Sequence, residues 1–262
     1  MGRIDLVNAR VLLTGASSGI GKELAIQLAR KGAQILITAR REERLRNLVE
    51  AIGQQTECPN VVYLAGDITQ DSHRRALVDL AKQAFDGIDI VINNAGIGAV
   101  GRFDSADSER LNKIMDVNFF AAVELIRLAL PIVKLSGSAA IVNIGSVLAQ
   151  YAVPKKSEYC ASKSALKAFS DSIRLELRKC GVSVISVHPN TTSSEFFDSL
   201  IERHELATKN PLSSTPAWVA QKIIHAIERR RNDVVLTASG HMMVGLSRLF
   251  PRIMRVVLGK FG

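Results

Sequence analysis

The chain of 262 residues lacks several patterns that mark other classes of protein. Its three cysteines, Cys58, Cys160 and Cys180, form neither a CxxC pair nor a cluster with histidine, so neither a zinc site nor a disulfide framework is expected. No segment supplies the roughly 20 uncharged apolar residues of a spanning helix. The first residues show no basic stretch followed by a long apolar run, so we expect no signal peptide. A cytoplasmic protein without bound metal is the simplest expectation.

Aromatic residues are also scarce, at 5% of the chain. That is too few to interleave with basic residues as nucleic-acid-binding surfaces do, so no nucleic-acid partner is expected despite the net charge of +9. The excess charge is concentrated near the end of the chain. From Arg229 to Gly262, seven basic residues and one acid, Asp233, give +6. This segment either meets an anionic partner or forms a solvated basic face.

Apolar strands and amphipathic helices alternate along most of the chain. The hydrophobic content of 47% and charged content of 23% are those of a globular protein, and the length suits one α/β domain. Alternating strands and helices indicate a parallel sheet covered on both faces. The predicted strands are residues 10–14, 34–39, 61–65, 88–92, 139–145, 182–187 and 233–237, and the longer predicted helices are residues 76–85, 111–135, 157–179 and 217–230.

A glycine turn follows the first predicted strand and precedes a helical pattern. Gly15, Gly19 and Gly21 have the spacing G-x-x-x-G-x-G, which differs from the dinucleotide fingerprint G-x-G-x-x-G. Glycines allow the backbone to approach a phosphate closely, and the start of a helix favours an anion. The turn therefore predicts a nucleotide site, although a glycine turn between strand and helix can also serve the fold alone.

The second predicted strand ends at Ala39, where NAD-binding proteins commonly place an acid. Arg40 and Arg41 follow instead, and an arginine suits the 2′-phosphate of NADP(H). Alternatively, these arginines decorate an exposed helix start. Cations at that position oppose the helix dipole, which favours a bound anion and hence NADP(H).

Tyr159 and Lys163 stand four residues apart in the predicted helix 157–179 and so share one helix face. An ammonium beside a phenol lowers the phenol pKa toward working pH, and the pair then becomes a general acid/base. In isolation the same spacing is also that of a packed ring beside a solvated amine.

Taken together, the sequence resembles the short-chain dehydrogenase/reductase family. The matching motifs, in family order, are residues 14–21, residues 93–96, Asn118, Ser146, and Tyr159 with Lys163. The resemblance implies a single Rossmann-like doubly wound domain over residues 1–262, with about seven parallel strands. It also implies NADP(H)-dependent hydride transfer between a carbonyl and an alcohol. A non-catalytic NADP-binding regulator on the same fold is the alternative, but the complete Ser146, Tyr159 and Lys163 set argues against it.

The resemblance assigns roles to four catalytic residues. Tyr159 would exchange a proton with the substrate oxygen, and Ser146 would polarise the carbonyl. Lys163 would lower the Tyr159 pKa and hold the nicotinamide ribose, while Asn118 would anchor a water that links Lys163 to solvent.

The resemblance likewise implies a cofactor site. Asp67 would meet the adenine, and Asn94 would support the ribose region. The family's Pro-Gly after the sixth strand is Pro189-Asn190 here, so contacts from Thr192 and Ser194 to the nicotinamide amide are less certain. The whole expected cofactor set is Gly15, Ser17, Ser18, Gly19, Ile20, Gly21, Arg40, Arg41, Asp67, Ile68, Asn94, Ala95, Gly96, Tyr159, Lys163, Pro189, Thr192 and Ser194.

Two segments near the end of the chain remain open to interpretation. A substrate lid is expected at residues 190–212, whose apolar residues suit a hydrophobic substrate or anchor a helix to the body. The extension 239–262 reads as two basic amphipathic helices divided at Pro251. It can dock on its own domain or on a second subunit, which we favour, or lie peripherally on a membrane. The family commonly forms homodimers or homotetramers through the helices carrying Asn118 and Tyr159.

Overall fold

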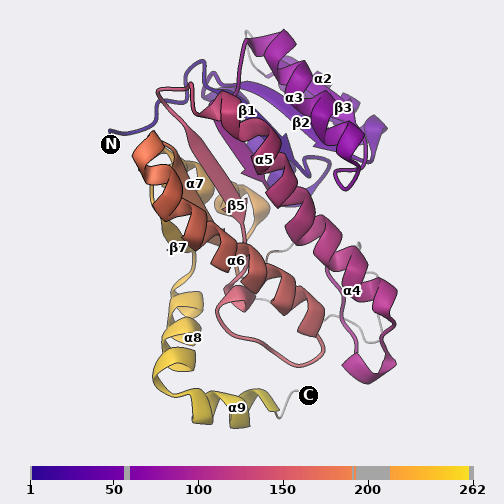
Figure 1. Ribbon diagram of the computed structural model, residues 1–262, viewed down its shortest axis with the longest axis vertical. Helices are drawn as coiled ribbons and strands as arrows, with labels where there is room; N and C mark the ends of the chain where they lie inside the picture. The colour runs from indigo at the N-terminus through magenta and orange to yellow at the C-terminus, as the bar shows by residue number, and fades with distance from the viewer. Residues whose placement is uncertain (1, 56–59, 191, 193–212, 260–262) are drawn as a thin grey trace.

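The computed structural model describes residues 2–55, 60–190, 192 and 213–259. One sheet of seven parallel strands runs through it in the order β3-β2-β1-β4-β5-β6-β7 (Figure 1), which confirms the predicted fold class. The strands are β1 (Arg10–Thr14), β2 (Gln34–Ala39), β3 (Val61–Ala65), β4 (Ile90–Asn93), β5 (Ala140–Ile144), β6 (Ser183–His188) and β7 (Asp233–Val235).

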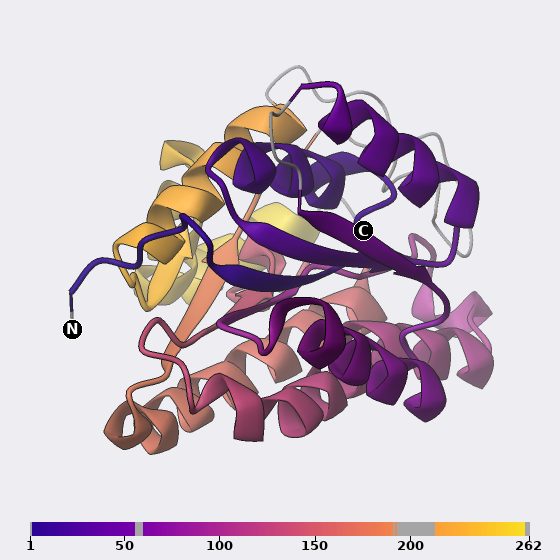
Figure 2. The same ribbon diagram turned by 90° about the horizontal axis from the view of Figure 1, so that it is seen from above.

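Helices cover both faces of the sheet, as Figure 2 shows from above. The helices α1 (Gly19–Arg30), α2 (Glu42–Gly53) and α7 (Pro216–Glu228) pack on one face. The helices α3 (Asp71–Phe85), α5 (Ala121–Val133) and α6 (Ser157–Leu177) pack on the other. Neighbouring residues of a strand therefore enter different cores: Val11 and Leu13 join the first, and Leu12 joins the second. This two-sided burial explains why the strands read as continuous apolar runs.

The helical pattern predicted at residues 111–135 is interrupted in the structure. It comprises α4 (Ser108–Met115), a π-helical turn (Asp116–Phe120) and α5. The extra residue of a π-turn shifts the helix face, and such turns occur frequently at functional sites. Here the turn carries Asn118, whose side chain is buried.

Helix α3 begins at Asp71, five residues before the predicted start at Ala76. Its first turn is polar, so it lacks the apolar periodicity from which the helix was predicted. Asp71 nevertheless suits that position, because a carboxylate near a helix N-terminus meets the positive end of the dipole.

The C-terminal extension forms α8 (Ala238–Leu249) and α9 (Pro251–Gly259), with Pro251 as the first residue of α9, as predicted. Thr237 caps α8, since its hydroxyl accepts a hydrogen bond from the Gly240 N–H at 3.0 Å. Figure 1 shows α8 and α9 extending beyond the body of the domain. Within the described ranges, no helix combines the length and apolar character needed to cross a bilayer.

A buried ion pair joins α4 to the start of α6. The Arg110 guanidinium donates to Glu158 Oε1 from Nη2 at 2.5 Å and from Nε at 2.9 Å, and the two side chains are only 1% and 5% exposed. Burial raises the pKa of Glu158, but hydrogen bonds from Ser157 and Arg110 outweigh it and keep the pKa below its ordinary value. Because Tyr159 is the next residue, this pair fixes the helix turn that carries it.

Replacing Arg110 alone with methionine should lower the free energy of unfolding by about 3–5 kcal/mol, because Glu158 is left charged and buried. The double variant R110M/E158M removes both charges and should recover most of that loss. Urea unfolding at neutral pH, followed by circular dichroism, measures both. If the double variant is as unstable as the single one, the pair stabilises the fold through the packing of its side chains and not through their charges.

Candidate active site

The carboxyl ends of the strands surround a cavity of about 500 Å³. It is lined by residues that follow β1, β2, β3, β4, β5 and β6, and by side chains of α6. Gly21 and Asn118 do not line it, and Ser194 and most of the expected lid lie outside the described residues. The expected residues that do line it are Gly15, Ser17, Ser18, Gly19, Ile20, Arg40, Arg41, Asp67, Ile68, Asn94, Ala95, Gly96, Ser146, Tyr159, Lys163, Pro189 and Thr192.

The glycine turn forms one wall of the cavity, and its conformation requires glycine. Gly15 and Gly19 have φ angles of +69° and +54°, which side chains rarely adopt. A Cβ on Gly21 would lie 2.1 Å from the carbonyl oxygen of Gly15, so this position takes no side chain either. The turn leads directly into the N-terminus of α1, where N–H groups and the helix dipole attract an anion. The residues present therefore fit the diphosphate of a dinucleotide.

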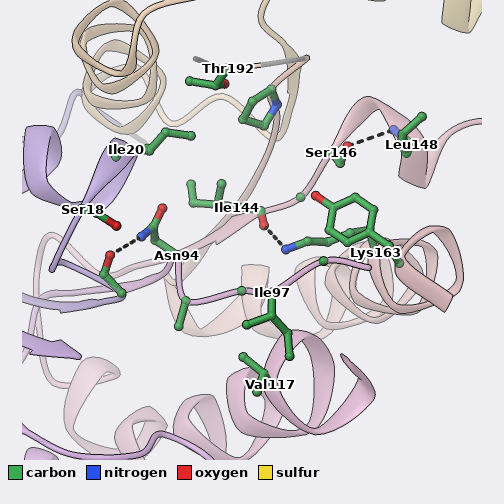
Figure 3. Close-up of a pocket in the computed structure, with 18 of the residues that line it drawn as sticks. Ser18, Ile20, Asn94, Ile97, Val117, Ile144, Ser146, Leu148, Lys163 and Thr192 are labelled. Atoms are coloured by element: carbon green, nitrogen blue, oxygen red, sulfur yellow. Dashed lines mark hydrogen bonds between the residues drawn. The ribbon is translucent and has the colours of Figure 1, made fainter. Parts of the chain in front are cut away.

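Asn94 braces this turn from the end of β4. Its Nδ2 donates to the carbonyl oxygens of Thr14 and Gly15, both at 3.0 Å. Figure 3 shows one of these bonds. In return, Thr14 Oγ1 accepts hydrogen bonds from the N–H groups of Asn94 and Ala95, both at 3.0 Å. The Asn94 side chain was expected to support the cofactor ribose. Its two N–H groups instead donate to backbone carbonyl oxygens of the protein. Thr14 takes part in three of these four hydrogen bonds, and sequence reasoning assigned no specific role to it.

The two arginines after β2 behave differently. Arg41 donates from Nη2 to the hydroxyls of Ser17 and Ser18, both at 2.9 Å, which ties it across the glycine turn. Arg40 is exposed and also lines the cavity. Both guanidinium groups therefore belong to the adenosine side of the site that the sequence predicts, where a phosphate would be held.

The loop after β3 is held from beneath by residues that sequence reasoning missed. Arg74 is buried and donates to the carbonyl oxygens of Ile68 and Thr69 at 2.8 and 2.6 Å. The His73 ring lies 2.9 Å from Thr38 Oγ1 through Nε2 and occupies the space that a Cβ on Gly66 would need. Burial lowers the pKa of His73, which favours the neutral ring. A polar helix start gives no periodic signal by which these two residues could have been found.

Lys163 is almost completely buried, and its Nζ donates to the carbonyl oxygen of Ile144 at 2.9 Å (Figure 3). Burial lowers its pKa to about 8. Its Nζ lies 5.9 Å from the centre of the Tyr159 ring. The sequence correctly places the two side chains on one helix face. One N–H of the Lys163 ammonium, however, donates to the backbone of β5.

The expected fall in the Tyr159 pKa is wrong for the protein without cofactor. The Tyr159 side chain is partly exposed to the cavity, but the surrounding protein desolvates its hydroxyl and raises the pKa to about 12, against a smaller lowering by a hydrogen bond with Ser146. Desolvation is the largest of these effects because a phenolate in this wall would lose its hydration. Tyr159 is therefore a protonated phenol at neutral pH.

Ser146 follows β5 and contacts both Tyr159 and the fold around it. Its Oγ accepts from the Leu148 N–H at 3.1 Å (Figure 3). Its carbonyl oxygen lies 3.1 Å from Nδ1 of the buried His188, so that nitrogen carries a proton. Nε2 of His188 faces Asp233 Oδ1 at 3.3 Å. His188, the last residue of β6, thus supports the backbone of Ser146.

Asn118 uses its side chain to clamp two segments together. Its Oδ1 accepts from the Ile97 N–H at 2.8 Å, and its Nδ2 donates to the Ile97 carbonyl at 2.9 Å and to Ser162 Oγ at 3.0 Å. A Cβ on Gly96 would lie 3.2 Å from Asn118 Oδ1 and 3.4 Å from Lys163 Nζ, so both groups flank that glycine. The proximity to Lys163 agrees with the expected pairing, and a water between them stays a prediction.

The departure at Pro189-Asn190 is accommodated without strain, because Asn190 does not adopt a positive φ. Its Nδ2 donates to Ser239 Oγ of α8 at 3.4 Å. Thr192 is buried, lines the cavity and donates to the Asn190 carbonyl at 3.3 Å. In the described part of the chain, no group of three or more histidine, cysteine, aspartate or glutamate side chains could hold a metal ion.

A glycine turn at a helix N-terminus thus shares the carboxyl rim of a parallel sheet with Ser146, Tyr159 and Lys163, which is where α/β proteins bind nucleotides and other ligands. The sequence pattern described as short chain dehydrogenase matches residues 9–205. The chain therefore belongs to the short-chain dehydrogenase/reductase family of oxidoreductases.

Curated relatives agree with this membership. The ketoacyl reductase HetN of Nostoc sp. is 34% identical over 234 residues, which cover 88% of this chain and 79% of the relative. The 11-beta-hydroxysteroid dehydrogenase 1A of Arabidopsis thaliana is 38% identical over 192 residues, which cover 73% of this chain and 54% of the relative. This chain therefore spans about half the length of the plant protein.

Solved structures share the fold. A short-chain dehydrogenase/reductase from Burkholderia phymatum in complex with NAD gives a TM-score of 0.85 at 22% identity, covering 95% of this chain and 96% of that one. An alcohol dehydrogenase from Thermococcus sibiricus complexed with 5-hydroxy-NADP gives 0.76 at 21% identity, covering 86% and 94%. At these identities the likeness concerns the fold, and the two structures carry different nicotinamide cofactors.

The burial of Lys163 predicts how the stability of the folded protein changes with pH. Its pKa is lowered from 10.5 to about 8, so the folded protein binds fewer protons than the unfolded chain between those values. Below that window the folded state carries the full cost of the buried ammonium, and the cost fades as pH rises through it. Lys163→Met should therefore be more stable than wild type at neutral pH, by ~3 kcal/mol before the lost hydrogen bond to Ile144 is subtracted. Urea unfolding should show this advantage shrinking toward pH 10.5; an advantage independent of pH would contradict it.

Proposed function

We propose that this protein is an NADP(H)-dependent oxidoreductase that interconverts a carbonyl and an alcohol on a hydrophobic substrate. The observation that carries the proposal is one cavity lined by Ser146, Tyr159 and Lys163 together with the glycine turn and Arg40. A non-catalytic binder of the same cofactor would have no use for a protonated phenol and a buried ammonium in that cavity.

The bound cofactor supplies or accepts the hydride, and the residues of this chain handle the proton and the charge. The protonated Tyr159 donates its proton to the carbonyl oxygen during reduction. Ser146 holds the same oxygen through its hydroxyl and stabilises the charge that develops there. Lys163 then favours the phenolate that Tyr159 becomes, because a nearby ammonium stabilises an anion in a site of low dielectric constant. Oxidation of an alcohol runs these steps in reverse.

The cofactor choice rests on charge at the end of β2. No acid stands at Ala39 to hold the 2′-hydroxyl of NAD, while Arg40 and Arg41 line the cavity at that point. Arg41 is already held by Ser17 and Ser18, so Arg40 is the freer of the two to meet a 2′-phosphate. A guanidinium fork matches phosphate oxygens in two places at once.

A hydrophobic substrate is supported by the wall around Lys163, where Figure 3 shows Ile97, Val117, Ile144 and Leu148. The names of the relatives, a ketoacyl reductase and an 11-beta-hydroxysteroid dehydrogenase, point to carbonyl and alcohol chemistry. The larger apolar residues that line the cavity outside the expected cofactor set are Ile97, Val100, Val117, Ile144, Val147, Leu148, Tyr151 and Val153.

The expected homodimer or homotetramer is also part of this proposal. Phe120 before α5 and Leu175 on α6 are 51% and 73% exposed, so apolar area is available on the helices through which the family commonly pairs. A cytoplasmic site of action remains part of the proposal too.

The direct test is a screen of ketones, aldehydes and alcohols of graded hydrophobicity, followed through the absorbance of NADPH. Turnover that increases with substrate chain length supports the proposal. Cofactor binding without turnover on any member of the screen would favour the non-catalytic alternative.

Tyr159→Phe keeps the ring and removes the proton donor. Turnover should fall by about 10²- to 10⁴-fold, with NADPH affinity nearly unchanged. Lys163→Ala should lower turnover and also weaken NADPH binding. Steady-state kinetics and fluorescence titration of NADPH separate the two effects, and Tyr63→Phe, in β3 and outside the cavity lining, is the matched control. Near-wild-type turnover of Tyr159→Phe would mean that another group donates the proton.

Arg40→Ala should weaken NADPH binding by about 1.5–3 kcal/mol and leave NADH binding almost unchanged, because only NADPH offers a phosphate to this charge. Ala39→Asp should repel the same phosphate and favour NADH. Titration of both cofactors measures the change, with Arg46→Ala, on an exposed part of α2 outside the cavity lining, as control. Equal affinity of the wild type for NADH and NADPH would overturn the assignment to NADP(H).

A further inference from the structure

The C-terminal helices α8 and α9 each expose an apolar stripe. On α8, Met242, Leu246 and Leu249 recur at helical spacing, and Leu249 is 75% exposed. On α9, Ile253, Val256 and Val257 also share one face, with Ile253 60% and Val256 66% exposed. Phe250, at the corner between the helices, is half exposed. Nowhere else in the described residues are so many large exposed apolar side chains close together in the sequence.

The opposite face of α8 is already occupied by the protein. Val244 packs with Val147 and Val235, and a Cβ on Gly240 would lie 3.1 Å from Val147 Cγ1. In helical positions these residues lie opposite Met242 and Leu246. Docking on the protein's own domain, one of the expectations from sequence, is therefore met by the inner face of α8 and leaves the outer stripe uncovered.

The charged residues of α8 and α9 all have one sign. Arg248, Arg252 and Arg255 are exposed, and Arg248 also donates from Nη2 to Gln150 Oε1 at 2.6 Å. The sequence contains no aspartate or glutamate after Asp233. If a second copy covered the extension with its own extension, six arginines would meet without a single carboxylate between them. Lipid headgroups with negative charge offer what such a contact lacks, and the acyl chains beneath them accept the apolar stripe.

We propose that α8 and α9 form a docking surface for an anionic membrane. The apolar stripes enter the boundary between headgroups and acyl chains, and the arginines lie among the phosphates. This is a peripheral contact, because neither helix is long enough to span a bilayer.

The docking surface is the outer side of a wall of the cavity. Val147, Leu148 and Tyr151, which pack with Val244 of α8, also line the cavity, and Asn190 at its edge is bonded to Ser239 of α8. A docked membrane would thus lie beside the cavity, and a lipid-soluble substrate could pass from the membrane into the cavity. Only this last step rests on the proposed function; the binding of lipid does not.

The test is co-sedimentation of the full chain with vesicles of phosphatidylcholine alone and of phosphatidylcholine mixed with phosphatidylserine. Binding to the anionic vesicles only, weakened by added salt, is expected because salt screens the arginines. The charge variant R252Q/R255Q should bind roughly 25-fold more weakly, about 5-fold for each arginine. The apolar variant I253S/V256S should lose binding even in low salt.

The matched control is R75Q/L135S, which removes an exposed arginine from α3 and an exposed leucine just after α5. It should bind as wild type does. Thermal melting checks that each variant folds. If the apolar variant I253S/V256S does not fold, the charge variant R252Q/R255Q still tests the proposal. Absence of vesicle binding by the wild type, or equal loss in the control, overturns the proposal. An oligomer that dissociates in I253S/V256S, without vesicle binding, would assign the stripes to an interface between copies.

Discussion

Parallel pairing of the strands is the constraint on which the rest of this structure depends. A parallel strand must be followed by a crossover that returns the chain to the same end of the sheet, so all carboxyl ends meet at one edge. Thr14, Asn93 and Ile144, far apart in the sequence, end β1, β4 and β5 at that edge. The glycine turn, Asn94 and Ser146 follow them and become neighbours. The position of the cavity at this edge therefore follows from the strand topology and not from particular side chains.

Burial gives the site its chemical character at a cost in stability. The same desolvation holds Tyr159 protonated, with a pKa near 12, and lowers the pKa of Lys163 to about 8. Both shifts disfavour the charged forms of these side chains. Such perturbed pKa values gathered in one cavity are common at functional sites, and the proposed function uses both groups.

The side chains around the cavity are positioned by buried polar contacts with the backbone. Asn94 holds the glycine turn, Asn118 holds residue 97, and His188 holds Ser146. Arg110 and Glu158 fix the start of α6 in the same way. An unpaired polar group at any of these places would cost free energy in the folded state, so each contact also narrows the conformations open to the site. The inner face of α8 packs behind Val147, Leu148 and Tyr151, which line the cavity, and so links the cavity wall to the exposed C-terminal helices.

The sequence by itself determined the alternation of strands and helices, the glycine turn and the shared helix face of Tyr159 and Lys163, because each depends on local spacing. It also placed the break before α9, since Pro251 cannot continue a helix. Only the tertiary structure decided the π-turn at Asn118, the partners of His73, His188 and Arg74, and the direction of the Tyr159 pKa shift. Those depend on desolvation and on contacts between residues distant in the chain, and no periodicity in the sequence reports how deeply a side chain is buried.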